Sequence, residues 1–568
     1  NDGAPPSQLT KYKVLFDDNN LYVLIRALDS VPGEIVSRLS RRDKEDGDWL
    51  AVSIDSYADK QTAFTFGITS AGVKFDFMLV NDNVNDPSWD ALYFAAAGID
   101  ALGWTAEMRI PLSQLRFAKL DQHNWGINIF RYIYRKQELS FWQPIPITAP
   151  GLVSLYGDLQ GLGGIKPRRD IELLPYAYTK ATYDKKEEGN PFQTGQKYKA
   201  TAGIDGKVSV TNDLTLNFTI NPDFGQVEAD PAVVNLTAFE TFYPEKRPFF
   251  IEGKNIFTFK LTGADSDNNM NMPFYSRRIG RAPQYKINAD SGIYVSAPEQ
   301  TAILGSFKLS GKTKKGLSIG IIESVTRNEK ATIDSAGYRH DLGVEPLTNY
   351  LIARLSQDFN KGTTTVGGIF TATNRSIKEP QLEFLADAAY TGGLNAIHFW
   401  KNKTYYLSGR AMFSGIYGSE TAITTLQRSP VRYYQRPDND HVTYDPTRTS
   451  LSGYGGTAEF GKTGTGNWQY MTYLTFRSPG LEFNDAGYLR QADEIQQLFW
   501  MRYRKFKPFS IFRWASANFT EYYTWDFGGD NINKGIDLNA NGQFKNYYTS
   551  GVGFNYAGST LARGELWG

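Results

Sequence analysis

The sequence contains no cysteine, and it has only four histidines in 568 residues. Without cysteine, disulfide bonds, thiol catalysis and zinc–thiolate sites are excluded. The histidines are not spaced like a pair of metal ligands on one helix or strand, so we expect each to be an isolated residue at a surface or facing a lumen. They are His123, His340, His398 and His441.

An excess of charge of one sign is also missing, because the chain has 61 Lys and Arg residues and 60 Asp and Glu residues. A dedicated nucleic-acid binder would need a basic excess, so we expect no nucleic-acid partner. No run of about 18 apolar residues occurs, which excludes a membrane-spanning helix. No signal segment precedes Asn1, so we expect a mature or trimmed form. These absences do not exclude a location in the membrane, because β-barrels cross it with short alternating strands.

The first 165 residues carry the pattern of short strands. Leu21, Val23 and Ile25 alternate with polar residues, and residues 64–79 predict a hairpin around a turn at 70–72. Further strands are predicted at 104–110 and 125–129, with a helical turn between residues 111 and 115. Regular short strands of this kind are typical of a β-sandwich. A glycine-rich stretch, residues 157–164, predicts the domain boundary.

Beyond this boundary the predicted strands lengthen to about ten residues, which matches the 9–11 residues of a tilted membrane-spanning strand. In one of them Ile303, Gly305, Phe307 and Leu309 are predicted on one face, with Leu304, Ser306, Lys308 and Ser310 on the other. The pattern recurs at 351–358, 405–414 and 468–477. Tight turns such as 312–315 alternate with long polar loops at 429–454 and 526–534, and aromatic residues cluster at strand ends.

The predicted fold class is therefore all-β: an N-terminal β-sandwich over 1–165, then a large antiparallel transmembrane β-barrel over 166–568 that we expect to continue past Gly568. A soluble sandwich is the alternative for the second part, because it would show the same alternation.

Two local motifs suggest a functional site, and each also has a purely structural interpretation. Residues 456–463 match the phosphate-loop pattern, but the next residues lead into a strand and not a helix, so we predict a hairpin. The acidic residues Asp46, Asp48 and Asp55 could supply oxygen ligands, which makes calcium the candidate cofactor and these residues its candidate site. The alternative is a solvated loop before a strand. No other cofactor is expected.

The segment from Asn221 to Gly253 has no two-residue alternation and little helical periodicity. Its backbone could not face lipid unsatisfied, so we expect residues 221–260 to fold into the lumen or over the mouth of the barrel. One interpretation is a plug held by ion pairs, and the other is a constriction that selects solutes. The charged residues of this segment are Glu228, Asp230, Glu240, Glu245, Lys246, Arg247 and Glu252.

The stretch from Asp223 to Gly253 resembles the signature of an uncharacterised Gram-negative outer-membrane β-barrel family. The N-terminal part is similar to family-9 carbohydrate-binding modules, which members of that barrel family carry in front. The matching segments are 14–17, 21–23, 48–52, 103–111 and 114–117. The resemblance covers nearly the whole chain, and it implies a β-sandwich, the outer membrane of a Gram-negative bacterium as location, and sugar binding.

In family-9 modules, aromatic rings hold a sugar beside acidic residues, in some cases with calcium. The resemblance therefore makes Trp49, Trp89 and Trp142 the candidate ligand-binding rings, with Trp89 expected to be the most exposed. Trp104 and Trp125 lie on the apolar faces of predicted strands, so we expect them in the core.

Three functions remain open at this point. The protein could be a channel or receptor that captures a glycan or passes a solute, with outer-membrane lipid and a glycan as partners. It could be a membrane-anchored docking subunit that contacts other outer-membrane or periplasmic proteins. The third alternative is a glycoside hydrolase that uses loop carboxylates, although a pair of catalytic carboxylates is defined by a separation in space that the sequence does not give.

Overall fold

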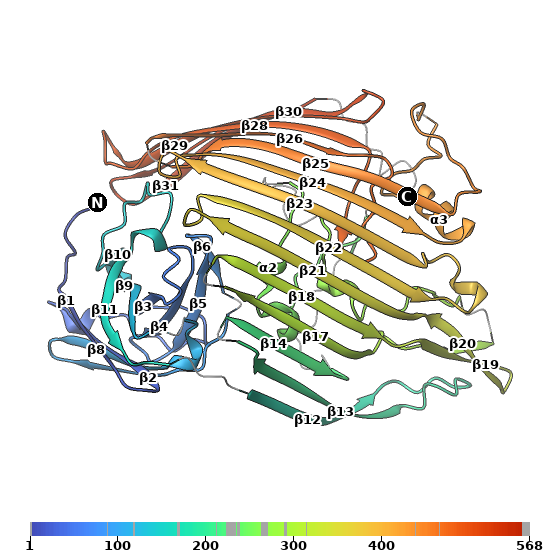
Figure 1. Ribbon diagram of the computed structural model, residues 1–568, viewed down its shortest axis with the longest axis horizontal. Coiled ribbons are helices and arrows are strands. Elements are labelled where there is room, and N and C mark those ends of the chain that lie inside the picture. Colours follow the sequence, from blue (N-terminus) through green and yellow to red (C-terminus); the bar gives the residue numbers. More distant parts are fainter. Residues whose placement is uncertain are drawn as a thin grey trace.

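The fold comes from a computed structural model of the chain, which describes residues 3–87, 89–117, 120–166, 171–211, 213–222, 234–235, 239–262, 271–288, 292–313, 315–437, 439–464 and 466–558. Within these ranges the regular secondary structure consists mainly of antiparallel strands. An N-terminal two-sheet domain lies against one end of a large curved sheet (Figure 1). No described helix is long and apolar enough to cross a membrane.

The N-terminal domain is a β-sandwich of two sheets. One sheet has the order β1-β2-β8-β7, and the other has the order β10-β9-β3-β4-β5-β6 with β11 paired to β9. The strands of the first sheet are β1 (Thr10–Phe16), β2 (Asn20–Leu28), β7 (Phe94–Asp100) and β8 (Gly103–Pro111). Those of the second are β3 (Trp49–Asp55), β4 (Ala63–Thr69), β5 (Lys74–Val80), β6 (Val84–Asp86), β9 (Gln122–Ile133), β10 (Glu138–Phe141) and β11 (Gly157–Gly163).

The core of the sandwich forms where the apolar faces of the two sheets meet. Leu21, Val23 and Ile25 of β2 pack in the same cluster as residues of β3, β4 and β9. Trp104 and Trp125 are almost completely buried there, as predicted. The predicted helical turn is a short 3-10 helix at Leu112–Gln114. The glycine-rich stretch that was predicted as the domain boundary includes the last strand of the sandwich, because Gly157–Gly163 forms β11 and pairs with β9.

In the second part of the chain, the described residues form a main antiparallel sheet of 15 strands in the order β12-β13-β14-β17-β18-β21-β22-β23-β24-β25-β26-β28-β29-β30-β31. These strands are β12 (Ile171–Tyr183), β13 (Gln196–Ser209), β14 (Leu214–Ile220), β17 (Ile303–Lys312), β18 (Leu317–Thr326), β21 (Leu347–Phe359), β22 (Thr364–Ser376), β23 (Ala388–Trp400), β24 (Tyr405–Tyr417), β25 (Ser450–Lys462), β26 (Trp468–Arg477), β28 (Glu494–Lys505), β29 (Phe512–Trp525), β30 (Asn531–Phe544) and β31 (Thr549–Ala557).

The two faces of this sheet are reversed relative to a soluble protein. On β17, Phe307 is 49% exposed whereas its neighbour Lys308 is 1% exposed. The same inversion holds along β18 to β26, where large apolar side chains point outward and polar ones point inward. Exposed examples are Leu355, Phe370, Leu394, Leu407, Phe413 and Leu474, and buried polar ones are Ser324, Arg354, Thr371, Thr391, Ser408, Thr457 and Thr475. This is the pattern of a membrane β-barrel with a lipid-facing outside and a polar lumen.

The start of β17 corrects one prediction. Ile303 is buried and Leu304 is exposed, the reverse of the faces expected for them. A register shift between Ile303 and Gly305 in the pairing with β18 explains the difference, because a bulge of one residue moves the preceding side chains to the other face.

The connections differ strongly at the two ends of the barrel. At the turn end, which lies against the sandwich, they are short and span residues 210–213, 313–316, 360–363, 401–404, 463–467, 506–511 and 545–548. At the loop end, the longer ones span 221–302, 327–346, 377–387, 418–449 and 478–493. They contain β15 (Asn271–Met272), paired with β27 (Tyr488–Leu489), and a small sheet of β16 (Ile293–Ser296), β19 (Glu329–Ser335) and β20 (Tyr338–Glu345).

The long polar loop predicted at 429–454 is shorter than expected. An amphipathic helix, α3 (Glu420–Arg428), precedes it, and β25 already begins at Ser450. Ser419 caps this helix by accepting a hydrogen bond from the Ala422 backbone N–H. The phosphate-loop-like residues 456–463 belong to β25 and the turn that follows it, which confirms the hairpin prediction.

Candidate functional site: a chamber between three parts of the chain

The connection from β14 to β17 contains a segment that turns into the barrel, here called the plug segment (described residues 239–262 and 271–288). It carries two short helices, α1 (Pro248–Ile251) and α2 (Lys254–Phe257). Helix α2 packs so closely on Gly320 of β18 that a Cβ there would lie 2.8 Å from Ile256 and Phe257 side-chain atoms. Farther on, the Leu261 carbonyl accepts a hydrogen bond from the Thr457 hydroxyl of β25. The plug segment therefore spans the lumen.

A buried lysine of the barrel wall holds the plug segment by its backbone. The Lys308 ammonium of β17 donates hydrogen bonds to the carbonyl oxygens of Phe249 and Glu252, the second at 2.7 Å. The Glu252 side chain binds the wall as well, through Lys207 at 2.7 Å and the Asn217 amide at 2.9 Å. These contacts satisfy backbone carbonyl oxygens in and just after the short helix α1, and an interrupted backbone of this kind at membrane depth is tolerated only where protein or water covers it.

The remaining charged residues predicted in this segment pair mostly within it. Glu245 contacts Arg247 at 2.7 Å and accepts a hydrogen bond from the Ser276 hydroxyl. Glu240 receives two hydrogen bonds from the Arg278 guanidinium, at 2.8 and 2.7 Å. Lys246 adjoins this network through its backbone N–H, which donates to Glu245. Glu228 and Asp230 lie outside the described residues.

An apolar cluster fills the lumen between the plug segment and the loop end. It joins plug residues to strand residues and to the connection between β26 and β28. The cluster comprises Phe250, Phe257, Phe259, Leu261, Ile279, Ile303, Ile322, Tyr350, Ile352, Ile369, Met412, Leu481, Phe483, Leu489 and Ala492. Because this packing is dense and apolar, it leaves the open part of the lumen toward the turn end.

The sandwich is fastened to the turn end by charged contacts. Lys312, at the end of β17, lies 2.7 Å from Asp59 of the sandwich and 2.9 Å from Asp358 of the barrel. Lys403 lies 2.6 Å from Asp82, and the Gln61 amide donates to the Lys361 carbonyl at 3.2 Å. The side chains of both lysines are less than one-fifth exposed. Buried ion pairs of this kind fix the position of two surfaces relative to each other, because separating the surfaces leaves buried charges without partners.

These contacts between the sandwich and the turn end, here called the seam, could not be predicted from the sequence. The lysines stand in tight turns and the aspartates in sandwich loops, and no local pattern links positions 253 or 321 residues apart. The only available hint was the concentration of lysine in turns 312–315 and 401–403.

Between the sandwich, the plug segment and the barrel wall lies a cavity of about 870 Å³, here called the chamber. The sandwich contributes Tyr57, Gln61 and Trp89 to its lining, and the plug segment contributes residues from Glu252 to Thr262. The barrel wall contributes polar side chains of several strands, among them Ser310, Ser318, Arg354, Ser356, Thr365, Asn395, Arg410 and Arg504. The volume lies within the range of roughly 300–1,000 Å³ that is usual for small-molecule sites.

The candidate tryptophans have three different environments. Trp89 lines the chamber but is not the most exposed ring, because it packs on Phe64 and Phe66 at centroid distances of 5.1 and 5.3 Å. Trp142 is the exposed one, at 44%, and makes an edge-on contact with Tyr12. Trp49 is half-buried between neighbouring rings of its own sheet. The three rings therefore do not form one platform.

The carboxylates considered for calcium are already engaged. Asp46 pairs with Arg38 at 3.1 Å, and the buried Asp48 accepts backbone hydrogen bonds from Val36 and Tyr134. Asp55 accepts the backbone N–H groups of residues 59 and 60, which closes the loop after β3. Each carboxylate thus has partners of its own, and the three do not form a group with the spacing of a metal site among the described residues.

Burial perturbs two sandwich carboxyls. Burial, and next the adjacent Asp59 carboxylate, raise the pKa of Asp55 to about 7. Burial also raises the pKa of Asp76 to about 6, although the Ala91 backbone N–H and the Arg42 guanidinium oppose the change. In both cases the loss of hydration of the charged form outweighs the local hydrogen bonds.

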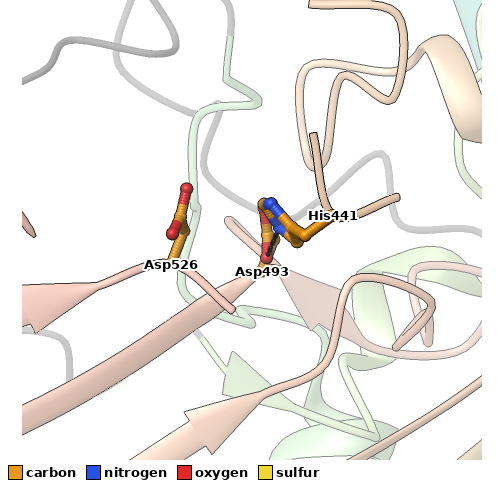
Figure 2. Close-up of side chains that lie close together, drawn as sticks. All are labelled: His441, Asp493 and Asp526. Atoms are coloured by element: carbon orange, nitrogen blue, oxygen red, sulfur yellow. Dashed lines mark hydrogen bonds and ion pairs between the residues drawn. The ribbon is translucent and has the colours of Figure 1, made fainter. Parts of the chain in front are cut away.

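Among the described residues, the one group of three side chains with the spacing of a metal site is His441, Asp493 and Asp526 at the loop end (Figure 2). His441 Nε2 lies 2.9 Å from Asp493 Oδ1. Arg436 already places its guanidinium between the carboxylates, 3.0 Å from Asp493 and 3.3 Å from Asp526. The arrangement is therefore an ion-pair cluster that ties three loops together. It also corrects the expectation of isolated histidines, as does His123, which is buried in the sandwich beside Phe117.

Comparisons with known proteins agree with this division of the chain. Residues 4–137 match the family described as "Carbohydrate family 9 binding domain-like". Residues 167–561 match the family described as "Domain of unknown function (DUF5916)". No curated protein matches the chain.

Solved structures show weak likenesses to each part. A putative carbohydrate-binding protein from Bacteroides uniformis is 15% identical, with 27% of this chain and 78% of that one covered and a TM-score of 0.23. Pseudomonas aeruginosa OccK8 (OprE) is 9% identical over 90% of this chain and 94% of that one, with a TM-score of 0.31. Acinetobacter baumannii OccAB2 is 9% identical over 91% and 93%, with a TM-score of 0.26.

The sheet topology and the reversed faces of its strands define the class: a plugged β-barrel of the outer-membrane type that carries a carbohydrate-binding-like sandwich. Within that class, the chain belongs to the DUF5916 family.

Proposed function

We propose that this protein is a gated channel in the outer membrane of a Gram-negative bacterium, and that its sandwich binds the sugar-like solute the barrel passes. The observation that carries this proposal is the chamber, because its lining is shared by the sandwich, the plug segment and the barrel wall. A sandwich that served only as a separate module would not need to contribute to a cavity in the lumen.

The orientation follows from the connections. In bacterial outer-membrane barrels the short turns face the periplasm and the long loops face outward. Under this proposal the sandwich lies in the periplasm, where it receives a solute from the lumen, and the outward apolar side chains contact lipid. Trp89 and Tyr57, with the hydroxyl and amide groups of the wall, supply the mixed apolar and polar lining that suits a pyranose.

A second candidate is a membrane anchor for a larger assembly, in which the sandwich docks periplasmic or outer-membrane partners. The apolar cluster that fills the lumen toward the loop end favours it, because such packing obstructs passage. The hydrolase alternative has no comparable support. Three of the four carboxylates in the described lining of the chamber, Asp82, Glu252 and Asp358, each pair with a lysine. The Gly-x-Ser-x-Gly spacing at residues 316–320 leads from a turn into β18 and not from a strand into a helix.

Liposome swelling separates the first two candidates. The full chain would be reconstituted, and swelling would be followed in isotonic arabinose, glucose and raffinose. A gated channel is expected to admit the smaller sugars slowly, and faster in a Lys308→Met variant in which the plug segment is released. Liposomes that stay impermeable to every sugar with both proteins would contradict the channel and favour the anchor.

A further inference from the structure

The chamber carries an unusual balance of charge. Seven basic and four acidic described side chains line it. Three of the acidic ones are neutralised by lysines, two of which also line the chamber: Asp82 by Lys403, Asp358 by Lys312 and Glu252 by Lys207. Of the remaining basic side chains, Arg410 pairs with Glu459 at 3.4 Å. Arg116, Lys260, Arg354 and Arg504 leave the lining with an excess of positive charge.

Arg354 is the most informative of these residues. It points inward from β21, is only 6% exposed, and makes no ion pair within the described chain. Its Nη1 donates to the Leu355 carbonyl at 3.0 Å, and its Nε has no hydrogen-bond partner. The guanidinium also lies 5.4 Å from the centre of the Phe259 ring. A buried cation without a counter-charge is costly, so a group of this kind is retained where an anion joins it.

The space around Arg354 is kept open by a glycine. A Cβ on Gly367 would lie 2.5 Å from Arg354 Nη1 and 3.0 Å from Asn395 Oδ1. The Asn395 oxygen is itself buried without a hydrogen-bond partner. Gly367 therefore lets a guanidinium donor and an amide acceptor lie side by side in the wall of the chamber. An arginine fork binds a carboxylate in two-point fashion, and an amide oxygen accepts from a hydroxyl.

Two more basic groups extend the positive surface. Lys260, on the plug segment next to Phe259, is half-buried and has no ion-pair partner among the described residues. The Nε of Arg504, on β28, is buried without a hydrogen-bond partner. The wall also offers Ser318, Ser356 and Thr365 as hydroxyl partners. The lining thus combines carboxylate-binding and hydroxyl-binding groups.

We infer that the chamber binds a small carboxylate-bearing sugar, an acidic monosaccharide of the uronate class, with Arg354 as the group that binds its carboxylate. The inference rests on the proposed function, because it names the solute class that the channel would pass. Lys260 belongs to the movable part of the site, so its charge would couple occupancy of the chamber to the position of the plug segment.

The test is calorimetric titration of the full chain in detergent with galacturonate, with galactose and with benzoate. Galacturonate is expected to bind at least tenfold more tightly than galactose, and more weakly as salt is raised. Arg354→Met should lower galacturonate affinity at least tenfold and leave galactose binding unchanged, whereas Arg354→Lys should retain part of it. Lys260→Met serves as a second variant, because its side chain is not needed in the barrel wall. Arg339→Met, which removes an ion pair on β20, is the matched control.

The outcomes distinguish the acidic-sugar inference from the proposed sugar channel. Galactose binding as tight as galacturonate binding would overturn the acidic-sugar inference while the sugar channel stands. Benzoate binding that depends on Arg354, without binding of either sugar, would support the carboxylate site and contradict the sugar function. Affinities for all three ligands that do not change in Arg354→Met and Lys260→Met would overturn the assignment of these residues.

Discussion

The Lys403 ammonium of a barrel turn lies 2.6 Å from the Asp82 carboxylate of the sandwich, 321 positions away in the chain. The Asp82 side chain also accepts the backbone N–H groups of Leu152 and Ser154. One carboxylate thus organises a sandwich loop and receives a barrel lysine. With the Lys312–Asp59 pair, it makes the sandwich part of the wall of the chamber.

Removing both seam lysines should detach the sandwich from the turn end. In Lys312→Met/Lys403→Met, partly buried carboxylates lose their partners, at a cost of a few kcal/mol in total. The chain has no cysteine, so Gln61→Cys and Lys361→Cys can report the seam through cross-linking with a short bismaleimide. We expect the cross-linked fraction to fall several-fold in the double variant. The single variant Gln61→Cys is the control, and an unchanged yield would contradict the role of the lysines.

Releasing the plug segment should open the barrel. Lys308→Met removes the ammonium that binds the carbonyl oxygens of Phe249 and Glu252, and those buried oxygens cost about 1–3 kcal/mol each when unpaired. Single-molecule conductance in planar bilayers is expected to rise and to fluctuate. Phe307→Leu, on the outward face of the same strand, should conduct like the native chain. Equal conductance in all three proteins would mean that Lys308 does not hold the segment.

The loop after β3 should loosen as the pH rises. Burial and the adjacent Asp59 raise the pKa of Asp55 to about 7, above the value of about 3.9 for an unfolded aspartate. A raised folded-state pKa gives stability that is complete below pH 4 and is lost as the pH rises through 7, by at most about 4 kcal/mol.

Hydrogen exchange of residues 56–62, corrected for its intrinsic pH dependence, reports this loosening in the full chain. The corrected rate should increase between pH 5 and pH 8 in the native chain and stay nearly constant in Asp55→Asn. Asp46→Asn, at an exposed residue paired with Arg38, should behave like the native chain. A rate that increases equally in Asp55→Asn would show that Asp55 is not responsible.

Replacing each of two tryptophans of the sandwich by alanine should change the stability of the sandwich by very different amounts. Trp104 is fully buried, so Trp104→Ala is expected to destabilise the sandwich by about 3–5 kcal/mol. Trp142 is 44% exposed, and Trp142→Ala should cost about 1 kcal/mol or less. Urea unfolding of the full chain, followed by tryptophan fluorescence, would measure both. Similar losses would place Trp142 in a buried contact.

The lipid-facing surface can be tested at a single position. Leu394, near the middle of β23, is 66% exposed. Leu394→Arg should oppose membrane insertion by about 2–4 kcal/mol if this face contacts lipid, whereas Leu394→Phe should insert normally. The heat-modifiable band on gel electrophoresis after folding into vesicles measures the inserted fraction. Equal insertion of both variants would contradict a lipid-facing position.

The sequence predicts the strands of this protein better than it predicts the contacts between the sandwich, the plug segment and the barrel wall. Alternation at Leu21, Val23 and Ile25, and again at Phe307 and Lys308, follows from a rule with a period of two residues, so the strands and their faces could be expected. The bulge before Gly305 escaped this rule because one extra residue has no signature in composition. Helix α3 was also missed, since its nine residues, which directly precede the predicted loop, are fewer than the about 11 over which helical periodicity can be recognised.

The candidate site could be predicted less well than the strands, because it depends on contacts between residues far apart in the chain. The charged density of residues 221–253 indicated a segment inside the lumen, but not which wall residues would hold it. Lys308 and Arg354 both appear in the sequence as ordinary inward residues of strands, and only the structure shows that one binds the plug segment while the other has no counter-charge. Trp89 was expected at a surface and instead lines a cavity, because the barrel covers it.

Under the proposed channel function, the position of the plug segment between β14 and β17 limits how the barrel opens. These strands pair with each other in the sheet, so both ends of the segment are anchored at one place on the rim of the barrel. The connection that contains the segment therefore leaves and re-enters the sheet between two neighbouring strands. Pairing of these two strands closes a loop around the plug residues, so the placement of the segment in the lumen and the closure of this part of the sheet belong to the same step of assembly.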